Sequence, residues 1–194
     1  MKGICGVGIN DAEYEVYKYD NIGGKSKVVW TCPFYSVWKS MICRCFSKKE
    51  KARIPSYLES SCVEEWFLFS NFKVWMETQD WEGKQLDKDL LVRGNKIYGP
   101  TTCLFVTQQV NLFLLERARD RGSYPLGVCW HKGTEMYIAK CNRVDGSSAH
   151  IGYFSTPEEA HKAWQLEKYK QSVILANMQT DNRVAKALVE RYKL

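Results

Sequence analysis

The chain has 194 residues, of which 45% are hydrophobic and 13% aromatic, so it can bury packed cores and is not a disordered polymer. Its formal net charge of +6 and sequence pI near 8.8 suit a nucleic-acid binder better than a partner for acidic small molecules. No stretch is long and apolar enough to cross a bilayer, so we predict no membrane partner. We expect two small domains, residues 1–119 and residues 121–194.

The eight cysteines indicate either disulfides or reduced thiols, depending on the compartment. The start of the chain, MKGICGVGIND, lacks the basic residues and the long apolar run of a secretory signal, so we predict a cytoplasmic protein with reduced thiols. No CxxC pair occurs, and buried single thiols are therefore favoured over structural zinc. The weaker alternative is a zinc site in the region of Cys32, Cys43, Cys45 and Cys62.

The first part of the chain passes from a strand pattern to helical patterns. Apolar and polar residues alternate over residues 14–30 around an Asn-Ile-Gly-Gly turn, which predicts a hairpin. Pro33 opens an amphipathic helix, and the basic segment 47–53 is typical of a solvated connection. Ser60 or Ser61 caps the next helix, whose aromatic side chains fall at helical spacing and are expected in a core rather than stacked on bases.

The stretch from Gln85 to Asn111 combines a polar-apolar strand, a loop with Gly and Pro, a second apolar strand and a helix. Asp87 lies on the first strand and Asn111 in the first turn of the helix. One divalent cation could bridge this carboxylate and this carboxamide, because Mg²⁺ prefers hard oxygen ligands and takes few of them from protein. The alternative is a solvated strand edge, whose alternating charges at Asp87, Lys88 and Asp89 deter aggregation.

The pattern changes after a polar linker at residues 120–123. Three short strands follow, GVCWH, MYIAKCNR and AHIGYF, which predict an antiparallel sheet. Thr156 and Pro157 then begin a helix as its cap and first residue, and a last helix spans residues 181–192. A sheet backed by one helix has a free face, and a ribbon of this kind can enter the DNA major groove.

The middle strand places Lys140 and Asn142 on the free face, with Cys141 toward the core. The segments YPLGVCWHK, YIAKC and IGYFSTPEEAHKAW are similar to the AP2 DNA-binding domain over residues 121–170. The resemblance implies DNA-facing side chains at Cys129, His131, Lys132, Lys140, Asn142 and His150. We add the neighbouring arginines Arg121 and Arg143 to this set. This face has fewer arginines and tryptophans than the same face of plant AP2 domains, which implies weaker contacts to phosphates and bases. The alternative for both histidines is exposed residues without partners.

The segment LDKDLLVRGNKIYGPTTCLFV, followed by Asn111, resembles the phage-encoded HNH-like homing endonucleases that carry a carboxyl-terminal AP2 domain. CPFYSVWKSMICRCF and VEEWFLFSNFKVW also resemble that group. The resemblance implies an α+β chain, with an HNH-like ββα-metal unit flanked by helices and an AP2-like three-stranded sheet packed on a helix. It implies Asp87 and Asn111 as ligands of Mg²⁺ or Mn²⁺, with Asp89 beside them, and Asn95 as the residue that orients the site. Lys88 stands where active members carry a histidine base.

Two functions follow from this reading. The first is metal-dependent nicking or cleavage of double-stranded DNA in the host cytoplasm, with Lys88 in the base role. No histidine occurs in the first 120 residues, and a lysine acts as a base only when its pKa is strongly depressed, which Asp87 and Asp89 oppose. The second is an inactive nuclease scaffold that binds DNA or a host protein, as a regulator or an inhibitor of a host enzyme.

Overall fold

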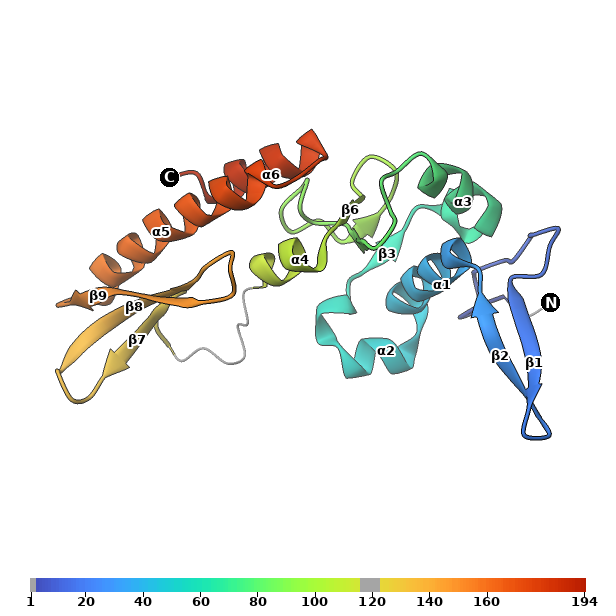
Figure 1. The fold of residues 1–194 in the computed structure, drawn as a ribbon, viewed down its shortest axis with the longest axis horizontal. Helices are drawn as coiled ribbons and strands as arrows, with labels where there is room; N and C mark the ends of the chain where they lie inside the picture. Colours follow the sequence, from blue (N-terminus) through green and yellow to red (C-terminus); the bar gives the residue numbers. More distant parts are fainter. Residues whose placement is uncertain (1–2, 116–122) are drawn as a thin grey trace. The chain divides into compact units, whose positions relative to one another are not determined.

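The computed structural model describes residues 3–115 and 123–194, so Arg121 and most of the predicted linker lie outside the described residues (Figure 1). Small sheets and helices alternate along the chain, which confirms the predicted α+β class. The chain divides into two compact units, Met1–Phe105 and Val106–Leu194. The domain limits expected at residues 119 and 121 stay a prediction. None of the helices in the described residues is long and apolar enough to span a membrane.

The first unit joins short paired strands to three helices. Its strands are β1 (Tyr17–Ile22), β2 (Lys25–Thr31), β3 (Ser61–Cys62), β4 (Gln85–Asp87), β5 (Ile97–Tyr98) and β6 (Leu104–Val106), which runs into the second unit. Its helices are α1 (Pro33–Phe46), α2 (Lys48–Arg53) and α3 (Phe69–Glu77), with 3₁₀ turns at Pro55–Tyr57 and Glu64–Phe67. Strand β1 pairs with β2 in an antiparallel hairpin, β3 with β5 in parallel, and β4 with β6.

The hairpin and the first helix agree with the sequence pattern. Gly23 and Gly24 close the β1–β2 turn at φ values of +62° and +74°, a left-handed conformation that glycine adopts without strain. Trp38 of α1 is fully buried, and its indole Nε1 donates a hydrogen bond of 2.7 Å to the carbonyl of Trp66. The aromatic side chains expected in a core, Trp66 and Phe69 among them, are buried around this tryptophan. They are therefore packing residues, not stacking platforms.

Two expectations for this unit are wrong. The basic segment 47–53 is not an irregular connection, because residues 48–53 form α2 behind a Ser47 cap whose hydroxyl accepts the Glu50 N–H. The helix expected to begin at Ser60 or Ser61 begins only at Phe69. Ser61 instead lies in β3, and its N–H donates to the carbonyl of Lys96, a partner distant in sequence.

The second unit is a three-stranded sheet with helices. It contains α4 (Gln108–Leu114), β7 (Val128–His131), β8 (Met136–Asn142), β9 (Ser148–Phe154), α5 (Pro157–Asn177) and α6 (Asn182–Tyr192). The strands are antiparallel in the order β7-β8-β9, as predicted. Thr156 caps α5 by accepting the Glu159 N–H, and Pro157 is its first residue, which confirms the predicted start.

Close packing joins α5 to the sheet and α4 to α5. Trp164 of α5 covers Gly127, where an added Cβ would come within 2.0 Å of the indole. Lys168 is buried, and its ammonium donates a 2.8 Å hydrogen bond to the carbonyl of Phe113 near the end of α4. Gln171 accepts the Val144 N–H at 3.0 Å. These contacts leave the opposite face of the sheet uncovered by α5.

Candidate functional site

The register of the β7–β9 sheet puts most of the predicted DNA-facing residues on one face. Cys129 pairs with Ile138, and His131 pairs with Met136. Lys140 lies opposite His150. Directly opposed residues share a face, and alternate residues of β8 share it too, so these pairs and Asn142 lie together. Lys140, Asn142, Cys129 and His150 are exposed and His131 is half-buried, whereas Cys141 points into the core, as predicted.

A β-bulge brings one further residue to this face. Ala139 pairs with Gly152 but the next residue, Lys140, pairs with His150, so Ile151 is extra in β9. Tyr153 therefore lies on the same face as His150, and their ring centroids are 4.8 Å apart. The ring of His131 is 5.7 Å from that of Tyr153. Strict alternation places residues 150 and 153 on opposite faces, which is why the sequence did not predict Tyr153 as part of the site.

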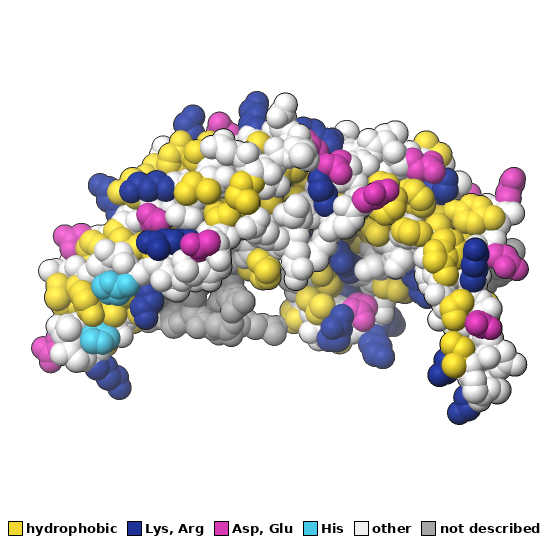
Figure 2. Space-filling model, in the orientation of Figure 1, with side chains coloured by type: hydrophobic (Ala, Val, Ile, Leu, Met, Phe, Trp, Pro, Cys, Tyr) yellow, Lys and Arg dark blue, Asp and Glu magenta, His cyan; other side chains and the backbone are white. Residues whose placement is uncertain are grey.

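The remaining predicted DNA-facing residues flank the sheet. Lys132 lies in the exposed β7–β8 turn, and Arg143 follows β8 and is exposed. The Nδ1 atom of His131 is 2.9 Å from the Thr134 hydroxyl, so this histidine has a partner in the turn. Figure 2 shows histidine side chains beside hydrophobic ones at the surface over β7–β9. We call the group Cys129, His131, Lys140, Asn142, His150 and Tyr153 the sheet face.

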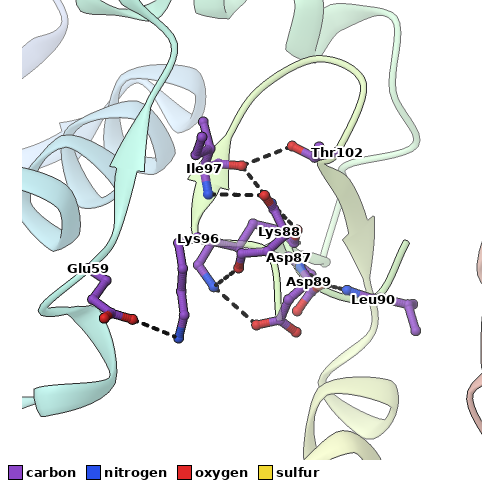
Figure 3. Close-up of polar contacts among 9 residues, drawn as sticks. Glu59, Asp87, Lys88, Asp89, Leu90, Lys96, Ile97 and Thr102 are labelled. Atoms are coloured by element: carbon purple, nitrogen blue, oxygen red, sulfur yellow. Dashed lines mark hydrogen bonds and ion pairs between the residues drawn. The ribbon is translucent and has the colours of Figure 1, made fainter. Parts of the chain in front are cut away.

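The second candidate site is the loop that follows β4. The strand ends at Asp87 because the Oδ1 atom of Asp87 accepts the N–H of Asp89 at 2.9 Å and that of Leu90 at 2.7 Å, which turns the chain (Figure 3). Lys88 and Asp89 thus lie in the loop, not on the strand as expected. Burial, and then the charge of Asp89, raises the pKa of the Asp87 carboxyl, although the two backbone N–H groups and Lys88 oppose the shift.

Lys88 is only 8% exposed, so this segment is not the solvated strand edge considered above. Its ammonium donates to Oδ2 of Asp89 at 3.0 Å and to the carbonyl of Asn95 at 3.1 Å (Figure 3). It also lies 5.7 Å from the centre of the Tyr98 ring. The carboxylate and the carbonyl both accept hydrogen bonds from the Lys88 nitrogen, whereas a general base accepts a proton at that atom.

Asn95 joins the two ends of the same loop. Its Nδ2 donates to the carbonyls of Lys88 and Ile97, both at 2.7 Å, while its Oδ1 accepts the Ile97 N–H at 3.2 Å. The Ile97 carbonyl also accepts the Thr102 hydroxyl at 2.9 Å. The position that the resemblance assigned to orienting the site therefore holds the backbone around Lys88 in place.

Asn111, the predicted partner of Asp87 in metal binding, lies in α4 of the second unit, while Asp87 lies in the first. The two-ligand site therefore stays a prediction. Within residues 3–115 and 123–194, no group of three or more His, Cys, Asp or Glu side chains has the arrangement of a metal site. Asp87 and Asp89 are hard oxygen donors of the kind that Mg²⁺ prefers, but the Asp89 carboxylate already pairs with Lys88.

Five of the eight cysteines are buried, as expected, whereas Cys43 is half-buried and Cys5 and Cys129 are exposed. Cys5 is exposed, and its Sγ lies 3.6 Å from that of Cys43. The Cys45 thiol hydrogen-bonds to Cys62, and burial reinforces the resulting rise in its pKa. Cys32 lies 3.6 Å from the Tyr14 hydroxyl. Of the four cysteines of the alternative zinc site, Cys45 and Cys62 contact each other, whereas Cys43 contacts Cys5 and Cys32 contacts Tyr14.

Comparisons of the chain with protein-family models, with curated proteins and with solved structures find no match.

Proposed function

We propose that this protein binds double-stranded DNA through the sheet face. The observation that carries the proposal is the shared face of Lys140, Asn142 and His150, opposite the face that packs on α5. A lysine ammonium suits phosphate or guanine, an asparagine carboxamide suits adenine, and a three-stranded ribbon can lie in the major groove. The net charge of +6 supports the same partner.

Quantitative binding of a random duplex library to the full chain tests this proposal. We expect Lys140→Gln to weaken binding across sequences, because it removes a cation that contacts phosphate or a base edge. Asn142→Ala should lower the preference at one base position, at a cost of about 1–3 kcal/mol. Lys162→Gln, which removes a charge from the exposed side of α5, is the matched control and should bind as the wild type does. Equal binding by all four proteins contradicts the proposal.

We propose as a second function the cleavage of that DNA with Mg²⁺ or Mn²⁺ at the loop after β4. The environment of Asp87 favours this function. Its carboxylate is half-buried and has a raised pKa, and one of its oxygens accepts two backbone N–H groups. Asp87 and Asp89, with Asn111 from the family resemblance, would hold the cation, which would supply charge stabilisation at the phosphate. Lys88 would orient Asp89, and Asn95 would hold Lys88.

Incubating phage DNA with Mg²⁺ and either the wild type or Asp87→Ala tests the cleavage. We expect cutting by the wild type alone, and equal or absent cutting by both proteins removes the enzyme function. The alternative is a binding protein derived from a nuclease, acting on DNA or a host protein. It is favoured by the Asp89 and Asn95 contacts of Lys88, which suit an ammonium and not a base. Under this alternative Lys88→His does not restore cutting, whereas DNA binding persists.

A further inference from the structure

A polar groove of about 510 Å³ lies in the first unit, between the base of the β1–β2 hairpin and helices α1 and α2. The hairpin contributes Tyr17 and Thr31, and α1 presents hydroxyl and cationic side chains along one side. Those side chains are Ser36, Lys39, Ser40 and Arg44, with Arg53 from α2. Figure 2 shows Lys and Arg side chains at the surface over α2. None of these residues belongs to the sheet face or to the loop after β4.

The charges in this groove are not balanced by the protein. Its lining contains three cationic side chains and one acidic side chain, and that acid, Glu50, pairs with Arg53 at 2.6 Å. The ammonium of Lys39 donates a hydrogen bond to the hydroxyl of Tyr17 at 3.0 Å. Arg44 lies over the Tyr57 ring at 5.7 Å and hydrogen-bonds to Tyr98. In the described residues no ion pair joins Lys39 or Arg44 to a carboxylate, so two positive charges have no acidic partner in the groove.

We infer that this groove binds the phosphodiester backbone of DNA, as a second contact that rests on the proposed DNA-binding function. Phosphate oxygens accept hydrogen bonds from Lys, Arg, Ser and Thr side chains, and this is the donor set of the groove. The exposed hydroxyls of Ser36 and Ser40 and the Lys39 ammonium lie on one helix at spacings of three and four residues, so they share a face. We infer a contact to phosphates rather than to bases, so it should act alike on every duplex sequence.

Salt titration of duplex binding by the full chain tests the inference. Each phosphate contact adds about 0.9 to the slope of log K against log salt. We expect Lys39→Gln to lower that slope by about 0.9, which is roughly a threefold smaller loss of affinity between 50 and 200 mM salt. The reduction should be the same for every duplex sequence. Lys162→Gln, on α5 of the second unit, removes the same charge and should leave the slope unchanged.

A second pair of variants separates the groove from any effect on folding. Ser40→Asp adds a negative charge beside Lys39 at an exposed helix position, and it should weaken binding at low salt by more than Ser40→Ala does. Circular dichroism and the melting temperature should match the wild type for both. If Ser40→Asp and Ser40→Ala bind equally well, the groove does not contact DNA.

The outcomes distinguish the inference from the function on which it rests. If the wild type shows no salt-dependent duplex binding, the proposed function fails and the groove proposal fails with it. If the wild type binds, Lys140→Gln lowers affinity and Lys39→Gln keeps the wild-type slope, only the groove proposal is overturned. Competition by inorganic phosphate at matched ionic strength addresses free phosphate as the ligand. A Lys39-dependent phosphate effect together with an unchanged DNA slope would assign the groove to free phosphate and overturn the DNA contact.

Discussion

The loop after β4 and the sheet face use similar side chains in opposite ways. In the loop, Lys88 and Asn95 donate hydrogen bonds to neighbouring carbonyls and to Asp89. On the sheet face, Lys140 and Asn142 are exposed to solvent. A polar side chain that is satisfied inside the protein fixes a conformation, whereas an exposed one is available to a ligand. The comparison therefore indicates a structural role for the loop, and it supports the proposal that the sheet face is the one that binds.

The largest loss of stability is expected where the sheet packs on α5. Gly127→Ala places a Cβ within 2.0 Å of Trp164 at a φ of +78°, so it combines a steric clash with backbone strain. We expect a loss of about 3 kcal/mol or more in the free energy of unfolding. Gly146→Ala is the control, because its φ is +85° but nothing lies within 4 Å, and it should cost about 1 kcal/mol. Chemical denaturation measures both, and equal losses would show that Trp164 does not constrain position 127.

The next largest loss of stability is expected in the loop after β4. Asn95→Ala removes donors to the carbonyls of Lys88 and Ile97 and should cost about 2–3 kcal/mol. Thr102→Val is a milder control, because it removes only one hydroxyl, which donates to the Ile97 carbonyl at 2.9 Å. Its loss should be nearer 1 kcal/mol. If Asn95→Ala unfolds at the wild-type denaturant concentration, the loop is not held by this side chain.

Local chemistry made several elements predictable. The hairpin follows from alternation around two glycines, and α5 follows from a Thr-Pro start. The face of β8 follows from the two-residue period of a strand. These features depend on residues close together in sequence, and the structure agrees with them for that reason.

Other positions could not be predicted from the sequence, because their partners are distant in the chain. Ser61 looks like a helix cap, but its N–H pairs with the Lys96 carbonyl across a long separation. The bulge at Ile151, which brings Tyr153 beside His150, depends on pairing with β8 rather than on the β9 sequence. Lys88 resembles a solvated charge in sequence, and its burial depends on the returning chain at Asn95 and Tyr98. Tertiary partners decided each of these positions.

A smaller effect of opposite sign is expected at Asp87. Its pKa is raised in the folded protein by burial and by the charge of Asp89, so ionisation costs more in the folded state than in the unfolded state. Asp87→Asn keeps an oxygen for the two backbone N–H groups and removes the charge. We expect a gain of about 0.5–2 kcal/mol at neutral pH, together with loss of any cleavage.

The pH dependence gives the sign of the Asp87 effect. Below its ordinary pKa of 3.8, the carboxyl is protonated in both states, and the variant and the wild type should be equally stable. As the pH rises past 3.8, the unfolded chain loses its proton first, so the advantage of the variant grows until the folded carboxyl also ionises. Urea denaturation at several pH values measures this, and a variant that is less stable at neutral pH would mean that the Asp87 charge is a stabilising one.

The smallest effect is expected on the sheet face, where substitutions should change DNA affinity without changing stability. Lys140→Gln and His150→Gln remove no ion pair recorded in the described residues, and both positions are exposed. Exposed positions of this kind usually tolerate substitution within about 0.5 kcal/mol. Melting temperatures of both variants should therefore match the wild type, while their duplex affinity falls. A variant that lost stability as Asn95→Ala is expected to do would make the face a structural network like the loop. Retained stability with weakened binding would instead leave recognition as the role of these exposed side chains.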